Sequence, residues 1–72
     1  MDNASYARLR KVIEDHGGPT PLANDLRISP SKIYNWSVGG YFPKADSLQA
    51  LARVTRVNLN WLLLGKGPKH RP

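Results

Sequence analysis

Apolar residues recur along the chain at spacings of three and four, separated by short polar stretches rich in glycine and proline. Tyr6, Leu9 and Ile13 form one such stripe, and Leu48 and Leu51 belong to another. This spacing matches the 3.6-residue period of an α-helix, whereas the alternation that indicates strands is rare. The pattern predicts five helices and no sheet, with the helices at about 4–15, 19–26, 30–38, 45–55 and 59–64.

Glycine and proline mark the ends of the expected helices. Gly17 follows the first helix and can adopt the left-handed conformation that ends one. Pro19 and Pro21 fall in the first turn of the second helix, where a missing backbone N–H removes no helical hydrogen bond. Ser29 followed by Pro30 is typical of an N-cap and a first helical residue. These positions predict short helices joined by tight turns.

The segment 22–36, LANDLRISPSKIYNW, predicts two short helices around a tight turn. Ala23 is small enough to let the helices approach closely, and Ile28 fills the space beneath the turn. In a helix-turn-helix the second helix is held outward and enters a major groove about 12 Å wide. The same spacing also fits an ordinary helical hairpin in a bundle. In both cases the internal residues are Leu22, Ala23, Leu26, Ile28, Ile33 and Trp36.

Length and composition exclude several classes of protein. A chain of 72 residues has room for one small domain, and its lack of cysteine excludes disulfides, thiolate metal sites, iron–sulfur clusters and a thiol nucleophile. His16 and His70 have no further ligands at metal-binding spacing, and the sequence holds no catalytic motif. We therefore expect no enzyme, no cofactor and no metal. The apolar runs are too short for a membrane span or a signal peptide, which predicts no membrane partner and a cytoplasmic location.

The net charge of +6 favours a polyanionic partner, although it also fits a role in solubility alone. No acidic residue lies between Asp25 and Asp46, whereas Arg27, Lys32 and Lys44 all lie in that interval. The region of the third helix is therefore locally positive, as expected for a surface that faces phosphate groups.

The order of these segments resembles the lambda-repressor-like helix-turn-helix family, also called the XRE or Cro/C1 family. The resemblance covers about residues 6–68: LANDLRISPSKIYNW is similar to the two-helix core, FPKADSLQALARVTRVN to the loop and fourth helix, and LNWLLLGKGP to the fifth helix and exit. The stretches GGPTPLA and GKGP are especially similar to phage repressor DNA-binding domains. The resemblance implies an all-α, compact five-helix DNA-binding domain over residues 1–64. Residues 65–72 are then a flexible basic tail, either a linker to a second domain or the end of a Cro-like protein.

The sequence departs from the family pattern at several positions. Arg27 in the turn and Arg56 after the fourth helix stand where the family commonly has glycine, and a left-handed arginine carries strain of about 1 kcal/mol. Pro19 stands where a glutamine often touches a phosphate. Pro30 and Ser31 stand where glutamines often read bases, so the resemblance implies a different code for DNA sequence.

The resemblance places side chains of the third helix in the major groove. Lys32 suits N7 and O6 of guanine, or a phosphate, and Asn35 suits N6 and N7 of adenine. Tyr34 suits a thymine methyl group or a phosphate, and it also fits packing against the fourth helix. Asn35 also fits a solvated amide. The candidate base-contacting residues are Ser31, Lys32, Tyr34 and Asn35.

Candidate phosphate contacts come from the start of the second helix, the turn and the loop 39–44. Free N–H groups at a helix start can bind phosphate, and the Gly39–Gly40 pair permits close approach of the backbone. Phe42 beside Pro43 is expected to plug the core instead. The candidate phosphate contacts are Pro19, Thr20, Arg27, Gly40, Tyr41 and Lys44.

The fifth helix offers a second candidate surface. Its WLLL sequence places four large apolar residues in a row, more than one helix face can bury. The family often dimerises through this region, so the resemblance implies that Trp61 and Leu64 meet a second subunit; alternatively, all four residues pack inside the domain. A homodimer, at least on DNA, would bind a pseudo-palindromic operator with half-sites about one helical turn apart.

The sequence thus predicts sequence-specific binding of double-stranded DNA by a transcriptional repressor or regulator of phage-repressor type. The recognition helix is expected at about residues 30–38. The alternative is a protein-interaction module on the same fold, such as an antitoxin or adaptor. The acid-free third helix favours DNA, because an apolar face there would favour a protein partner.

Overall fold

The structure, a computed structural model, describes residues 3–70 and contains five α-helices within that range. The predicted all-α fold is confirmed; the first helix begins one residue earlier than expected, and the third ends one residue earlier, at Ser37. The described residues form no strand, only one isolated β-bridge between Val57 and His70. The helices are α1 (Asn3–Asp15), α2 (Pro19–Leu26), α3 (Pro30–Ser37), α4 (Ala45–Thr55) and α5 (Leu59–Leu64).

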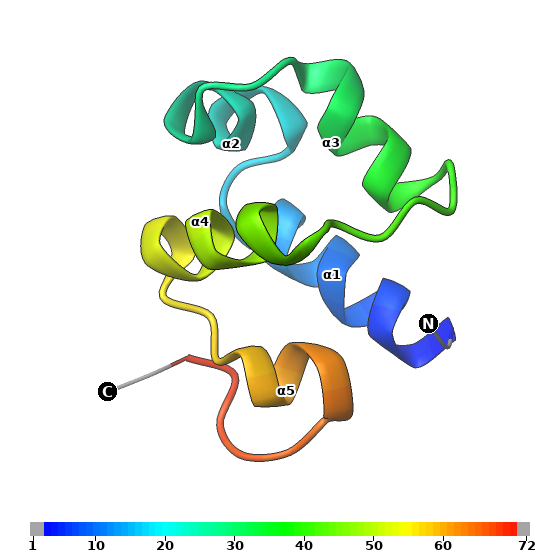
Figure 1. Cartoon of the computed structure of the whole chain (residues 1–72), viewed down its shortest axis with the longest axis vertical. Helices are drawn as coiled ribbons and strands as arrows, with labels where there is room; N and C mark the ends of the chain where they lie inside the picture. Colours follow the sequence, from blue (N-terminus) through cyan, green and yellow to red (C-terminus); the bar gives the residue numbers. More distant parts are fainter. Residues whose placement is uncertain (1–2, 71–72) are drawn as a thin grey trace.

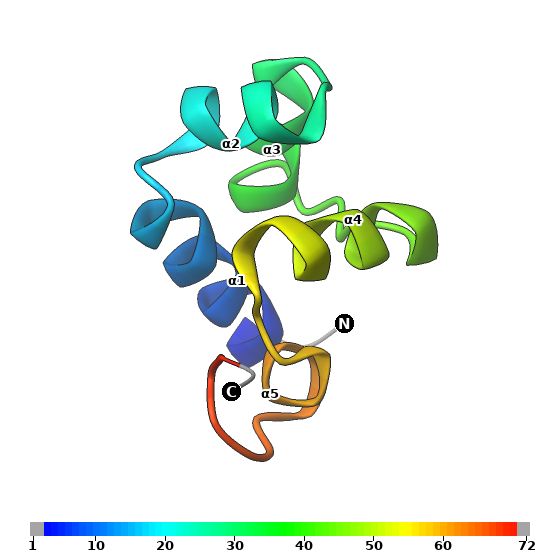
Figure 2. The same ribbon diagram turned by 90° about the vertical axis from the view of Figure 1, so that its left-hand side faces the viewer.

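The helices are arranged along the long axis of the molecule. In Figure 1, α2 and α3 lie together at one end, α1 and α4 lie in the middle, and α5 lies at the other end beside the C-terminal segment. Figure 2 shows the same order after a quarter turn. The α2–α3 pair and α5 therefore present separate surfaces on opposite sides of the α1–α4 layer.

One hydrophobic core joins all five helices. Leu9 on α1, Leu22 on α2, Ile33 on α3, Leu51 on α4 and Leu62 on α5 are each fully buried. The apolar stripes predicted from sequence therefore meet at one centre. Of the internal set expected for the segment 22–36, four residues belong to the buried core, while Leu26 and Ile28 are partly buried and pack against it.

Polar side chains of α1 cap the short helix α5. The Ser5 hydroxyl donates to the carbonyl oxygen of Leu63 at 3.0 Å, and Arg8 Nε donates to that of Leu62 at 2.9 Å. Arg8 Nη2 also donates to the Ser5 hydroxyl at 3.2 Å. Carbonyl groups in the last turn of a helix have no hydrogen-bond partner within that helix. The bonds from Ser5 and Arg8 supply partners for two of these carbonyls. They anchor α5 to the first helix.

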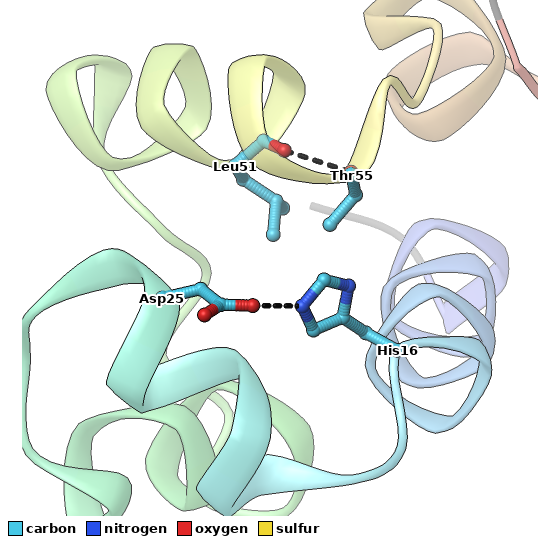
Figure 3. Close-up of polar contacts among 4 residues, drawn as sticks. All are labelled: His16, Asp25, Leu51 and Thr55. Carbon is cyan, nitrogen blue, oxygen red and sulfur yellow. Dashed lines mark hydrogen bonds and ion pairs between the residues drawn. The ribbon is translucent and has the colours of Figure 1, made fainter.

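Side-chain bonds also hold the junctions of α1, α2 and α4 (Figure 3). His16, just after α1, lies 2.7 Å from the carboxylate of Asp25 on α2, measured from Nε2 to Oδ2. The Thr55 hydroxyl donates to the carbonyl oxygen of Leu51 at 2.7 Å and accepts from the backbone N–H of Val57 at 3.2 Å. These contacts fix the direction of the chain where α1 and α4 end.

Arg27 and Arg56, which stand where the family commonly has glycine, end α2 and α4 in the left-handed conformation. Their φ angles are 60° and 65°. Each backbone N–H bonds carbonyls of the last helical turn, which closes the helix as a glycine usually does. Because both residues carry a Cβ, each position stores strain of about 1 kcal/mol.

The segment after α5 folds back onto the domain over its described part, residues 65–70. The backbone N–H of Asn58 donates to the carbonyl oxygen of Lys69 at 2.8 Å, and the Asn58 side chain donates to that of Pro68 at 3.0 Å. Lys69 also pairs with Asp15 on α1. The sequence pattern missed this because the bonds are made by backbone and polar groups, which leave no apolar signal. Residues 71–72 of the expected tail lie outside the described residues.

Candidate nucleic-acid interface

The turn between α2 and α3 fixes the two helices relative to each other. The backbone N–H of Ile28 donates to the carbonyl oxygen of Ala23 at 3.0 Å, immediately after left-handed Arg27. Ala23 on α2 and Ile33 on α3 are both fully buried in the apolar core that the two helices share. The result is a rigid helix-turn-helix in which α3 follows directly from a supported turn.

The start of α3 is capped as its sequence predicts. The Ser29 hydroxyl accepts from the backbone N–H of Ser31 at 3.1 Å, and the Ser29 carbonyl accepts from Lys32 at 3.0 Å. Pro30 occupies the first helical position, where it forfeits no hydrogen bond. The cap holds the backbone of the residues that carry the candidate base contacts.

The helix α3 divides into a buried face and an exposed face. Ile33 is fully buried and Trp36 is 4% exposed, so Trp36 belongs to the core as expected. All four candidate base-contacting residues are exposed. Tyr34 is 52% exposed, which favours the contact interpretation over packing against α4. The exposed face presents Ser31, Lys32, Tyr34 and Asn35.

Two grooves flank this exposed face, and Asn35 lines both. The first lies between the starts of α2 and α3, and the second, of about 780 Å³, lies between α3, the following loop and the start of α4. Together they bring candidate base contacts and candidate phosphate contacts onto one continuous surface. The first groove is lined by Pro19, Pro30, Ser31, Tyr34 and Asn35; the second is lined by Lys32, Asn35, Trp36, Gly40, Tyr41, Phe42, Lys44, Asp46 and Ser47.

The loop 38–44 turns back tightly at the end of α3. The carbonyl oxygen of Asn35 accepts from the backbone N–H groups of both Gly39 and Tyr41, at 3.0 and 3.3 Å. Gly40 has a φ of 78°, which favours glycine. Tyr41 is 69% exposed, and Phe42 is partly buried against the core, as expected. The loop therefore holds Gly40 and Tyr41 at the surface beside α3.

Two of the candidate phosphate contacts line neither groove. Thr20 is exposed in the first turn of α2, next to Pro19, which does line the first groove. Arg27 is exposed in the turn before α3. Eight of the ten candidate DNA contacts thus line the two grooves beside α3, and Thr20 and Arg27 lie outside these grooves.

The candidate dimer residues lie at the other end of the molecule, on α5 (Figure 1). Leu64 is 65% exposed. Trp61 is partly buried, and the Lys69 ammonium lies 5.8 Å from the centre of its ring. Leu64 is therefore an open apolar contact, whereas Trp61 is partly covered by the returning C-terminal segment.

The structure adds two residues that the sequence pattern did not assign to the site. The Tyr6 hydroxyl on α1 donates to the carbonyl oxygen of Gly40 at 2.8 Å, and Arg10 Nη1 donates to that of Ser37 at 3.4 Å. In the sequence, Tyr6 shows only the spacing of an apolar stripe. That spacing does not indicate a hydrogen-bond partner 34 residues away. Both side chains brace the loop that follows the recognition helix.

Metal sites and membrane spans were also considered for the part of the chain that the structure describes. Residues 3–70 hold no cluster of three or more histidine, cysteine or acidic side chains able to bind a metal ion. His16 instead pairs with Asp25. Among the described helices, none is both long and apolar enough to cross a membrane.

A buried two-helix scaffold with a capped, outward-facing polar helix defines a helix-turn-helix domain. Comparison with known families agrees: the family model of the bacteriophage CI repressor helix-turn-helix domain matches residues 8–70. The chain belongs to this family, which is of the lambda-repressor-like type inferred from sequence. It is accordingly a helix-turn-helix domain of the kind found in phage repressors.

A curated relative supports the same class. The chain is 30% identical over 59 residues to an uncharacterized HTH-type transcriptional regulator of Haemophilus influenzae, with 82% of the chain aligned. The aligned region spans 25% of the length of that relative. No solved structure matches the chain significantly.

Proposed function

We propose that the domain binds double-stranded DNA sequence-specifically and acts in a transcriptional repressor or regulator of phage-repressor type. The observation that carries this proposal is the exposed polar face of α3, where Ser31, Lys32 and Asn35 stand on a rigid, capped helix. Family membership supports DNA as the partner. In this proposal α3 enters the major groove and α2 lies across the backbone.

The base-reading roles follow from the donors and acceptors on α3. Lys32 donates to N7 and O6 of guanine, and Asn35 pairs with N6 and N7 of adenine. Ser31 hydrogen-bonds a base edge close to the start of the helix. Exposed Tyr34 contacts a thymine methyl group. Because Asn35 lines both grooves, it stands at the centre of the proposed contact surface.

The phosphate contacts surround this centre. Pro19 and Thr20 bring the start of α2 to one strand. The backbone N–H of Thr20 is the donor directed at a phosphate, because Pro19 has no N–H. Gly40, Tyr41 and Lys44 bring the loop and the start of α4 to the backbone on the other side of α3. Exposed Arg27 adds a further positive charge at the margin.

A pseudo-palindromic operator bound by a homodimer completes the proposal. Exposed Leu64, with Trp61 beside it on α5, supplies an apolar contact at the end of the molecule away from α3. Two copies related by a two-fold axis would place their recognition helices about one DNA turn apart.

A protein-interaction module remains the competing function, because large apolar side chains are exposed near the end of α3. Tyr34, Val38 and Tyr41 are 52%, 65% and 69% exposed. Titration of a labelled random duplex at two salt concentrations separates the two functions. DNA binding predicts measurable affinity at low salt that falls steeply as salt rises, with a log–log slope of about −0.9 per phosphate neutralised. Absence of binding at low salt would favour a protein partner.

A further inference from the structure

Two side chains of α1 donate to backbone carbonyls on both sides of the point where α3 ends. Tyr6 and Arg10 are four residues apart, so they project from the same face of α1. Arg10 reaches the carbonyl oxygen of Ser37, the last residue of α3, and Tyr6 reaches that of Gly40 in the loop. The first helix thus holds the end of the recognition helix and the loop after it.

The Tyr6 side chain contacts both chain neighbours of Tyr41. Its hydroxyl binds the carbonyl of Gly40 at 2.8 Å, and its ring packs edge-on against Phe42, with centroids 5.3 Å apart and planes at 84°. Tyr41 itself is 69% exposed. An exposed side chain is therefore presented by a backbone that is fixed on either side by one residue of α1.

This loop has a sequence that would otherwise order poorly. Gly39 and Gly40 are consecutive, and glycine loses more backbone entropy than any other residue when it is fixed in one conformation. A loop that orders only upon contact with DNA would lose affinity by that entropy. The hydrogen bonds that the Asn35 carbonyl accepts, and the one that the Tyr6 hydroxyl donates, restrict the loop before any ligand is bound.

We propose that Tyr6 is a positioning residue for DNA: its hydroxyl preorganises Gly40 and Tyr41 for contact with a phosphate. This inference rests on the proposed DNA-binding function. Tyr6 acts through the carbonyl of Gly40, and Arg10 supports it at Ser37. Affinity for any duplex should depend on Tyr6, and the choice between sequences should not.

The variant Tyr6→Phe separates this role from simple packing, because it keeps the ring against Phe42 and removes only the hydroxyl. Its affinity for duplex DNA should fall about three- to tenfold, the scale of one net hydrogen bond. The salt slope should stay close to that of wild type, because neither Tyr6 nor Tyr41 carries a charge, and the preferred DNA sequence should also stay the same. In the DNA-free protein, amide hydrogen exchange at Tyr41 should be faster than in wild type, while exchange in the core of α1 should be unchanged.

Double-mutant cycles give a matched control. Tyr6→Phe and Tyr41→Phe should together weaken binding less than the sum of their separate effects, because both act through one contact. Tyr6→Phe and Thr20→Val, which belong to different parts of the proposed interface, should be additive. If Tyr6→Phe alters folding, Arg10→Met provides a second variant with the same expected pattern.

Three outcomes would overturn the positioning role. The first is wild-type affinity and wild-type exchange at Tyr41 in Tyr6→Phe, and the second is additivity in both cycles. The third is a changed sequence preference, which would mean that Tyr6 acts on base reading. Failure of the wild-type protein to bind any duplex would overturn the proposed DNA-binding function together with this role, so the two failures are distinguishable.

Discussion

A methyl group on the α-carbon of Gly39 would lie 2.9 Å from the carbonyl oxygen of Asn35 and 3.0 Å from its α-carbon. This carbonyl accepts hydrogen bonds from Gly39 and Tyr41, and the Asn35 side chain is the proposed reader of adenine. The absence of a Cβ at Gly39 therefore lets the loop close directly on the backbone of a base-reading residue. A shift of the Asn35 backbone at this point would therefore affect both the shape of the loop and the reading of bases.

Replacement of Gly39 by alanine should disturb both properties. Because the atoms that meet the new methyl group belong to the backbone, they cannot move away cheaply, and we expect Gly39→Ala to cost about 1–3 kcal/mol of stability. The folded fraction should also bind DNA more weakly. Urea unfolding and duplex titration measure the two effects. Gly67→Ala is the matched control, since Gly67 has a φ of 79° in the segment after α5 and its substitution should cost stability alone. Wild-type stability of Gly39→Ala would contradict the account.

Arg27→Gly should have opposite effects on folding and on binding. Relief of left-handed strain stabilises the folded state, and the greater freedom of glycine in the unfolded chain offsets part of the gain, so the net stabilisation should be at most about 1 kcal/mol. Loss of the charge should reduce the salt slope of DNA binding by about one unit. Arg56→Gly, which changes the same kind of backbone position at the end of α4, should leave DNA affinity close to that of wild type. Marked destabilisation by Arg27→Gly would refute the strain at this position. An unchanged salt slope would refute the phosphate contact of Arg27.

Arg8→Met should destabilise the domain without acting on DNA directly. The substitution keeps an apolar stem and removes the bonds to the carbonyl of Leu62 and to the Ser5 hydroxyl, which should cost about 1–3 kcal/mol. The midpoint of urea unfolding is the measurement. Lys11→Met is the control, because Lys11 is exposed on the same helix and should change stability by less than about 0.5 kcal/mol. Equal effects of the two substitutions would show that Arg8 does not cap α5.

Leu64→Glu tests the proposed dimer surface. An acidic side chain at this exposed apolar position should weaken association of two copies on a pseudo-palindromic duplex and leave binding to a single half-site unchanged. Sedimentation or light-scattering mass on both duplexes distinguishes these cases. A mass of one protein chain per palindromic duplex for the wild-type protein at saturation would rule out the proposed dimer.

The sequence predicted the helices well because their signals are local. A period of 3.6 residues and the Ser29–Pro30 start both depend on neighbours in the chain. It also placed the candidate contacts of α3 correctly on an exposed face, since buried Ile33 and Trp36 determine which side of the helix points outward.

The missed features depend on contacts between distant residues. Tyr6 has the spacing of a core residue, and only the folded structure shows its hydroxyl bound to a carbonyl 34 residues away. Ser5 is a small polar residue near the start of α1, yet it is buried and its hydroxyl bonds α5. The segment around Lys69 lacks large apolar residues, so its hydrogen bonds with Asn58 leave no pattern in the sequence. Polar contacts of this kind depend on tertiary geometry.

Selection of duplexes from a random pool, performed in parallel with the wild-type protein and with Asn35→Ala, tests the central claim most directly. The claim predicts that the wild-type protein enriches one motif, arranged as two related half-sites. Asn35→Ala should bind that motif about 1–3 kcal/mol more weakly and lose preference at one position in each half-site. Lys44→Ala, a proposed phosphate contact, should retain the full motif. No enriched motif for the wild-type protein, or an unchanged preference in Asn35→Ala, would contradict the claim that α3 reads DNA through this side chain.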